Sequence, residues 1–279
     1  MVERLKEAIE KARAQRAQLL AGGPAAPAPA PPRPEGASAW TALQPIELSP
    51  GRLQRNRIIT LDRSDPAHTT FDVLRSRILK AFQDRGWKRL AITSPTKGCG
   101  KTFVAVNLAL SFARQPDLKT LLVDMDLRAP SVARALGLEM RSSMRDFLTG
   151  SLAPEAHLRR LGDNLALALG GARVGNAAEL ILEKRTATIL AQTIDRMSPD
   201  IVIYDLPPML VNDDAFAFLP QVDAVLLVAA AGETRAGQIA ACERLFQDGT
   251  AFLGVVLNKV EERPDDAYAY GYGYGQDQG

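Results

Sequence analysis

The segment AITSPTKGCGKTFVAVNLAL, residues 91–110, decides the fold. It predicts a buried strand, a loop with two glycines and a helix, because an apolar run precedes the loop and apolar residues recur at helical spacing after it. Lys101 and Thr102 at the start of the helix are typical of a P-loop, in which backbone N–H groups and the helix N-terminus hold phosphate oxygens. In such a loop the lysine reaches the β- and γ-phosphates, and the threonine hydroxyl binds Mg²⁺.

The loop departs from the GxxxxGK[ST] pattern at one place, where Pro95 stands instead of the first glycine. A chance Gly-Lys-Thr at a helix start is therefore the alternative. If the loop binds a nucleotide, we expect the phosphates to contact seven consecutive residues: Thr96, Lys97, Gly98, Cys99, Gly100, Lys101 and Thr102.

Two further segments place acidic residues at the ends of apolar strands. TLLVDMDLRAP (residues 120–130) has Asp124 at the end of its apolar run and Asp126 just beyond, and IVIYDLPPML (residues 201–210) has Asp205. A carboxylate at the end of a buried strand is costly unless a cation or hydrogen bonds compensate it. Three acids facing one P-loop therefore predict Mg²⁺, although any one of them could be an ordinary cap or turn residue.

Short apolar runs alternate with helical patterns along the rest of the chain. This alternation predicts an α/β fold with a doubly wound, mostly parallel sheet, helices on both faces, and ligands at the carboxyl ends of the strands. We expect strands at residues 89–94, 120–124, 200–205, 223–228 and 253–258, and helices at residues 65–86, 101–114, 177–197 and 235–246.

Asn258 directly follows the last predicted strand. A side-chain amide at this place can read the edge of a purine, and Asn258-Lys259 looks like the base-reading loop of related P-loop nucleotidases. Glu261 leaves guanine open as the base. An ordinary turn asparagine is the alternative.

The chain divides into four parts. Residues 1–21 have apolar side chains at helical spacing and predict an amphipathic docking helix, for which a solvated, fraying helix is the alternative. Residues 22–50 are rich in proline and alanine and predict a semi-rigid linker. Residues 51–262 form the P-loop domain, and residues 263–279 are expected to be a disordered tail because they have no apolar period.

Composition and charge argue against several classes of protein. The net charge of +2 gives no support for nucleic-acid binding. Cys99 and Cys242 are too few for a disulfide framework or a four-cysteine zinc site. No apolar run approaches the roughly 20 residues of a membrane span. We therefore expect a cytoplasmic protein that lies at the inner face of the cell membrane only through a partner.

The P-loop ending GKTFVAVNLA, the DMDLRAP segment and the DLPP segment resemble the Walker A, Walker A′ and Walker B motifs of the bacterial tyrosine kinases of the CpsD/CapB type. The resemblance extends over residues 57–258 and includes GLEMRSSMRDFLTG and GNAAELI as weaker pieces. It implies an ATP- and Mg²⁺-dependent protein-tyrosine autokinase that regulates capsule or exopolysaccharide synthesis and export.

The same resemblance implies roles for individual residues. Lys101 would neutralise the transferred phosphate, and Asp126 would orient or deprotonate the acceptor tyrosine. Thr102 would bind Mg²⁺ with help from Asp124 and Asp205. The catalytic set is therefore Lys101, Asp124, Asp126 and Asp205.

Four of the five tyrosines lie close together near the C-terminus: Tyr268, Tyr270, Tyr272 and Tyr274. A flexible tail can bring its hydroxyl groups into an active site, and this cluster resembles the autophosphorylated tails of the same kinases. A sticky, low-complexity tail is the alternative. Tyr204 lies within an apolar strand and is expected in the core.

The resemblance also implies partners. These are a membrane adaptor of the polysaccharide co-polymerase type in a separate chain, further copies of this chain, and a tyrosine phosphatase. The family's helix before the P-loop commonly has an E-x-x-R-x-x-R pattern that builds a ring of subunits. Thr69, Asp72 and Arg75 occupy those positions here, so the usual ring of ion pairs is incomplete.

The MinD/ParA-like positioning ATPases share this fold and are the main alternative, followed by a non-catalytic, nucleotide-dependent interaction module. They have a second lysine five positions before the P-loop lysine, where this chain has Thr96, and Lys97 is one position out of register. Their second motif continues into a proline, whereas Asp126 is followed by Leu127 and Arg128. We therefore favour the kinase. Arg128 is a weaker candidate for the site, with a salt bridge as its alternative role.

Overall fold

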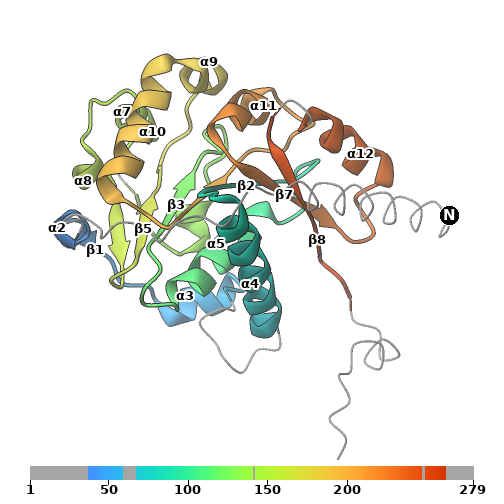
Figure 1. Ribbon diagram of the computed structural model, residues 1–279, viewed down its shortest axis with the longest axis horizontal. Helices are drawn as coiled ribbons and strands as arrows, with labels where there is room; N and C mark the ends of the chain where they lie inside the picture. Colours follow the sequence, from blue (N-terminus) through green and yellow to red (C-terminus); the bar gives the residue numbers. More distant parts are fainter. Residues whose placement is uncertain (1–36, 59–66, 141, 247–248, 262–279) are drawn as a thin grey trace, which may run out of the picture.

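The computed structural model describes residues 37–58, 67–140, 142–246 and 249–261 (Figure 1). Its centre is an eight-stranded sheet with the order β1-β4-β5-β3-β6-β2-β7-β8, and every neighbouring pair is parallel except β4 and β5. The predicted α/β fold with a mostly parallel sheet is therefore confirmed. The strands are β1 (Gln44–Pro45), β2 (Arg89–Thr93), β3 (Thr120–Asp124), β4 (Arg159–Leu161), β5 (Leu165–Ala168), β6 (Ile201–Asp205), β7 (Ala224–Ala230) and β8 (Ala251–Asn258).

Helices cover both faces of the sheet (Figure 1). Leu121 and Val123 of β3 pack into one core with α2, α7 and α9–α12, whereas Leu122 packs into the other core with α3–α6. Alternate side chains of one strand are therefore buried on opposite faces, which explains why the strands are continuous apolar runs. The helices are α2 (Ala37–Thr41), α3 (Pro50–Arg55), α4 (Ala67–Arg85), α5 (Lys101–Ala113), α6 (Val132–Ala135), α7 (Met144–Leu148), α8 (Pro154–His157), α9 (Ala177–Leu182), α10 (Lys184–Met197), α11 (Asp214–Phe218), the 3₁₀ turn η1 (Leu219–Gln221) and α12 (Ala236–Leu245).

The three central strands end at the same edge of the sheet. In the register of the sheet, Asp124 of β3 is paired with Asp205 of β6, and Asp205 is paired with Ile92 of β2. The chain leaves β2 at this edge and enters α5 through the P-loop. The carboxyl ends of the strands thus bring the predicted acids next to the predicted phosphate loop.

Several sequence-based expectations differ from the structure. The helix predicted over residues 177–197 was wrong as a single element, because Glu183 has an extended backbone (φ −63°, ψ 129°) that separates α9 from α10. No glycine or proline marks this break. Strand β1 and the antiparallel pair β4 and β5 were not predicted, since QP, RRL and LALA are shorter than the other strands.

The first described helix, α2, begins at Ala37, inside the range expected to be linker. Trp40 of α2 is buried, and its indole nitrogen donates a hydrogen bond of 2.6 Å to the carbonyl oxygen of Met197. The expected docking helix, most of the linker and the tail lie outside the described residues.

His157 at the end of α8 is the fully buried histidine of the described core. Its ring stacks on Phe147 with centroids 4.6 Å apart, and Nε2 lies 3.2 Å from the sulfur of Met144. Burial, assisted by the charge of Arg159, lowers the pKa of His157 to about 4. The imidazole is therefore neutral in the folded protein at neutral pH.

This burial predicts a pH-dependent stability. An unfolded histidine has a pKa of about 6.5, so the unfolded chain takes up the proton first and the folded state loses stability as pH falls from 6.5 towards 4. His157→Leu removes this titration. Urea unfolding at pH 7 and pH 4.5 should show that the variant gains about 2–3 kcal/mol relative to wild type at the lower pH. Parallel pH dependences of the two proteins would contradict the buried neutral histidine.

Candidate active site

The P-loop lies between β2 and α5. Gly98 and Gly100 both have left-handed backbone, with φ of 84° and 92°, a conformation that glycine adopts without steric cost. The loop turns into α5 at Lys101, where the first N–H groups of a helix have no partner within the helix. Pro95 in place of a glycine therefore does not prevent the loop from turning into the helix.

Lys101 lies against two carboxylates. Its Nζ is 2.8 Å from Oδ2 of Asp126 and 3.4 Å from Oδ1 of Asp205. Burial lowers the pKa of Lys101, but the charges of Asp205 and Asp126 outweigh burial and leave that pKa raised. Lys101 is therefore a charged group at the start of α5.

Thr102 contacts the same carboxylate from the next position of the helix. Its Oγ1 donates a hydrogen bond of 2.6 Å to Oδ2 of Asp205 and lies 2.7 Å from Oγ of Ser131. Burial raises the pKa of Asp205, although the charge of Lys101 and the hydrogen bond from Thr102 oppose this. Asp205 thus connects the end of β6 to the first turn of α5.

Asp124 is enclosed by backbone donors. Its Oδ2 accepts hydrogen bonds of 2.9 Å from the N–H groups of both Ser131 and Val132, and its Oδ1 accepts one of 3.2 Å from the N–H of Asp126. Burial and the nearby charge of Asp205 raise the pKa of Asp124 to about 7. Asp124 therefore holds the loop after β3 in place beside the other acids of the site.

The site has more negative than positive charge, because three carboxylates surround one ammonium group. Such a surplus in a buried site favours a cation. Among the described residues, no group of three or more His, Cys, Asp or Glu side chains is arranged to hold a metal ion by itself. Mg²⁺ commonly binds through one or two carboxylates together with water and substrate phosphates, so these residues fit an ion that is bound jointly with a nucleotide.

Arg128 forms a salt bridge, which was the alternative to a role in the site. Its Nε and a terminal nitrogen donate to the two oxygens of Asp214 over 2.5 Å and 3.0 Å. Asp214 is buried in the first turn of α11, and such bidentate pairs are among the strong hydrogen-bonded contacts. The pair connects the loop that follows β3 to the segment that follows β6.

Asn258 lies against the P-loop. Its Nδ2 donates a hydrogen bond of 2.9 Å to the carbonyl oxygen of Cys99. A Cβ added to Gly100 would lie 2.1 Å from the same Nδ2, so only glycine fits at that position. The predicted base-reading residue thus supports the loop, while its amide oxygen and second N–H remain as further hydrogen-bonding groups.

The DLPP segment packs directly on the P-loop. The hydroxyl of Thr93 donates to the carbonyl of Pro207 over 2.7 Å, and the N–H of Met209 donates to the carbonyl of Ser94 over 2.8 Å. The N–H of Leu210 donates to the carbonyl of Pro95 over 3.1 Å. The position of the phosphate loop therefore depends on the segment that carries Asp205.

Sequence reasoning missed three residues that contact the predicted site residues: Ser131, Asp214 and Thr234. Ser131 had a usable signal, because it follows the DMDLRAP segment directly. Asp214 and Thr234 had none, because each meets its partner only through the tertiary fold. Thr234 lies 3.7 Å from the buried thiol of Cys99 and also accepts a hydrogen bond from the N–H of Ala230.

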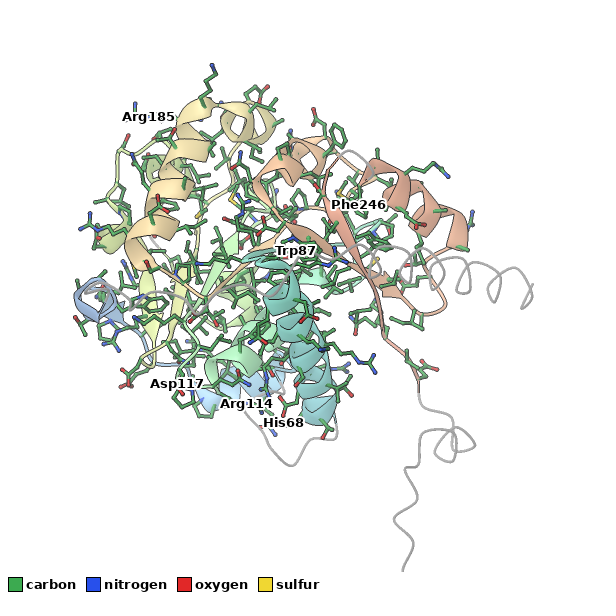
Figure 2. The ribbon with its side chains drawn as sticks, viewed as in Figure 1. His68, Trp87, Arg114, Asp117, Arg185 and Phe246 are labelled. Carbon is green, nitrogen blue, oxygen red and sulfur yellow. The ribbon has the colours of Figure 1, made fainter. Side chains whose placement is uncertain are left out.

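Two residues at the positions of the family's ring pattern, Asp72 and Arg75, make contacts within the chain. Asp72 of α4 accepts hydrogen bonds from Arg75 (3.0 Å), Ser111 (2.8 Å) and Arg114, and lies 3.4 Å from His68. Figure 2 shows His68 and Arg114 close together at the same end of α4 and α5. Asp72 and Arg75 thus help to join these two helices.

The predicted acceptor tyrosines of the tail lie outside the described residues. In the part of the chain that the structure describes, no helix combines the length and apolar character needed to cross a membrane.

Comparisons with known proteins match the chain to nucleotide-binding domains and to tyrosine-protein kinases. The model of the CobQ/CobB/MinD/ParA nucleotide binding domain matches residues 90–269. The tyrosine-protein kinase YwqD of Bacillus subtilis (strain 168) is 32% identical over 209 residues, which are 74% of this chain and 87% of YwqD. The tyrosine-protein kinase CpsD of Streptococcus pneumoniae serotype 4 is 34% identical over 177 residues, which are 62% of this chain and 77% of CpsD.

A solved structure agrees with these relatives. The kinase domain of the Escherichia coli tyrosine kinase ETK is 28% identical, superposes with a TM-score of 0.69, and matches 87% of this chain and 92% of that domain. The alignment with the complete etk protein of Escherichia coli (strain K12) covers only 28% of its length.

The contact between Gly100 and Asn258 predicts unequal effects of alanine at the two loop glycines. Gly98→Ala should cost about 1–2 kcal/mol through left-handed backbone strain alone, because nothing lies within 4 Å of its added Cβ. Gly100→Ala should cost at least about 2 kcal/mol more, because its Cβ meets Asn258. Urea unfolding without nucleotide measures both values. Asn258→Ala should recover part of the loss only in the Gly100→Ala background, and equal losses in both glycine variants would contradict this contact.

Proposed function

The chain belongs to the bacterial tyrosine-protein kinases within the CobQ/CobB/MinD/ParA family of nucleotide-binding domains, and from this membership we propose how its own residues act. It is an ATP-dependent protein-tyrosine autokinase. We propose that Mg²⁺ accompanies the ATP and that the enzyme regulates capsule or exopolysaccharide synthesis and export. The proposed acceptors are the tail tyrosines: Tyr268, Tyr270, Tyr272 and Tyr274.

The arrangement around Lys101 carries this proposal. A charged lysine, the hydroxyl of Thr102 and three carboxylates meet where a P-loop enters its helix. Phosphoryl transfer requires mainly positioning and neutralisation of charge, which such groups supply. This arrangement therefore supports transfer of the γ-phosphate.

The proposed transfer uses few protein groups. The phenolic oxygen of a tyrosine attacks the γ-phosphorus, the bond from this phosphorus to the β–γ bridging oxygen breaks, and ADP leaves. Asp126 accepts the hydroxyl proton, and the ammonium group of Lys101 balances charge on the phosphoryl oxygens. Bound Mg²⁺ would further neutralise the phosphates, held by Thr102, Asp124 and Asp205.

The ion pair between Lys101 and Asp126 must separate before Asp126 can accept the proton of the tyrosine. Their 2.8 Å contact engages the carboxylate of Asp126 with the ammonium group, so this carboxylate is already paired before a tyrosine hydroxyl arrives. A γ-phosphate is a stronger competitor for the ammonium group because it carries more negative charge. Binding of ATP would therefore draw Lys101 away and leave the carboxylate of Asp126 free for the tyrosine hydroxyl. Asn258 would contact the base with the amide atoms that Cys99 does not use.

We also propose the partners and the location. The first proposed partner is a membrane adaptor of the polysaccharide co-polymerase type in a separate chain, as the similarity to kinases of the CpsD type implies. Other copies of this chain would present tails to neighbouring active sites, and a tyrosine phosphatase would remove the phosphates. The kinase would then be cytoplasmic and held at the membrane by its adaptor.

The proposed function predicts tyrosine labelling that depends on Lys101. Purified protein incubated with ATP and Mg²⁺ should acquire phosphotyrosine, and mapping by mass spectrometry should place most of it at residues 268–274. Lys101→Met should abolish the label while the protein stays folded, because the charge on the transferred phosphate is no longer balanced. Changing all four tail tyrosines to phenylalanine should remove most label and leave ATP binding unchanged.

Other outcomes would favour the alternatives. ATP hydrolysis without labelled protein, stimulated by membrane or DNA, would indicate a positioning ATPase. Nucleotide binding without hydrolysis or label, even with a peptide from the adaptor, would indicate a non-catalytic module. Label that persists in Lys101→Met would remove the P-loop assignment.

A second prediction separates metal binding from acceptor activation. Asp124→Asn and Asp205→Asn should weaken binding of Mg²⁺-ATP, because each removes a charge next to the expected ion. Asp126→Asn should leave that affinity within about threefold and lower kcat by about 10²-fold, since a general base acts in the transition state. Calorimetric binding and single-turnover kinetics measure the two effects. Equal losses of affinity in all three variants would assign Asp126 to the metal site instead.

A further inference from the structure

We propose that the hydroxyl group of Ser131 is part of the Mg²⁺-nucleotide site, where it works together with Thr102. This inference rests on the proposed function, because it requires that Thr102 binds the ion. The main evidence for this role of Ser131 is the 2.7 Å separation between its Oγ and Oγ1 of Thr102. These two oxygen atoms come from different segments: Thr102 lies in the first turn of α5, which follows β2, and Ser131 lies in the loop that follows β3.

Ser131 does not have the role that its position in the helix suggests. It is the N-cap residue of α6, where serine normally accepts a hydrogen bond from the helix backbone, but its side chain makes no such bond. Asp124 instead accepts the N–H groups of Ser131 and Val132. Ser143, the N-cap of α7, shows the ordinary arrangement, because its side chain accepts a hydrogen bond from the N–H of Asp146. The hydroxyl of Ser131 is thus released from capping and directed to Thr102.

The directions of the hydrogen bonds follow from the available protons. The hydroxyl of Thr102 has one proton, which it donates to Asp205. Ser131 must therefore be the donor to Thr102 and occupies one of the two lone pairs on Oγ1, while the ammonium group of Lys101 donates to the same oxygen over 3.4 Å. A cation that binds Thr102 needs a lone pair of the same oxygen, so it would replace one of these two donors, and the hydroxyl of Ser131 lies next to the position that such an ion would take.

The spacing of the two oxygens suits Mg²⁺. Ligands of Mg²⁺ lie at 2.0–2.1 Å in nearly octahedral geometry, so neighbouring ligand oxygens are about 2.9 Å apart. The observed separation of 2.7 Å is close to this value. Ser131 can therefore act beside Thr102 with little movement, with its own oxygen oriented towards the ion or towards a water of the ion.

Replacement by alanine tests the hydroxyl alone. The backbone N–H of Ser131 would still donate to Asp124, and no cap bond would be lost, so Ser131→Ala should fold normally. Ser131→Thr keeps a hydroxyl and should restore the wild-type behaviour. Ser143→Ala is the matched control, because it removes a serine from an N-cap that does not contact the site.

The experiment measures binding of a fluorescent ADP analogue while Mg²⁺ is varied, and binding of Mn²⁺ in the presence of ADP by electron paramagnetic resonance. Ser131→Ala should leave the affinity without metal unchanged, but should reduce the gain in affinity from Mg²⁺ and the affinity for Mn²⁺ by about three- to tenfold. Wild type, Ser131→Thr and Ser143→Ala should agree within about twofold.

Two results would overturn the proposal. One would contradict only the role of Ser131, and the other would contradict the metal-binding role of Thr102. If Ser131→Ala keeps the full effect of Mg²⁺ and normal Mn²⁺ binding, Ser131 has no part in the site, while the proposed function stands. If the wild-type protein binds the nucleotide without any effect of Mg²⁺, the assignment of Thr102 as a metal ligand is wrong, and the inference for Ser131 ends with it.

Discussion

The cost of burying three carboxylates beside a single lysine is the constraint on which the structure around the site depends. Asp124 and Asp205 are fully buried, and an isolated charge in such a place would cost several kcal/mol. Lys101, the hydroxyl of Thr102 and backbone N–H groups compensate them in part. The raised pKa values of both acids show that the compensation is incomplete. Stability is thus given up locally, as is common where a site must bind a charged ligand.

The surrounding structure holds this arrangement in place through long-range contacts. The register of β3 against β6 sets Asp124 beside Asp205. Arg128 then connects the loop after β3 to the start of α11 through its bidentate pair, and Asn258 fixes the P-loop from the end of β8. The segments that follow β3, β6 and β8 therefore meet around the P-loop, which follows β2. A shift in any one of them would move the phosphate site.

How much could be predicted from the sequence depended on the range of the interaction. The P-loop, the acids at strand ends and the mostly parallel sheet were predictable, because apolar runs and glycine positions are local signals. The break at Glu183 was not, since no glycine or proline marks it. Two contacts also could not be predicted, because they join residues far apart in the sequence. Ser131 and Thr102 are 29 positions apart, and Arg128 and Asp214 are 86 positions apart. Patterns along the chain indicate which residues matter, but only the fold shows which pairs meet.

The charge balance further suggests the order in which ligands can enter. A free nucleotide brings several negative charges to a site whose three carboxylates face one ammonium group, so its approach is opposed unless a cation comes with it. A nucleotide that carries Mg²⁺ brings a smaller net charge and supplies phosphate and water oxygens that the protein does not provide. Lys101 could then exchange Asp126 for a phosphate oxygen, while the ion that arrives with the nucleotide would compensate Asp124 and Asp205. The buried acids thus favour the metal complex over the free nucleotide before any chemical step begins.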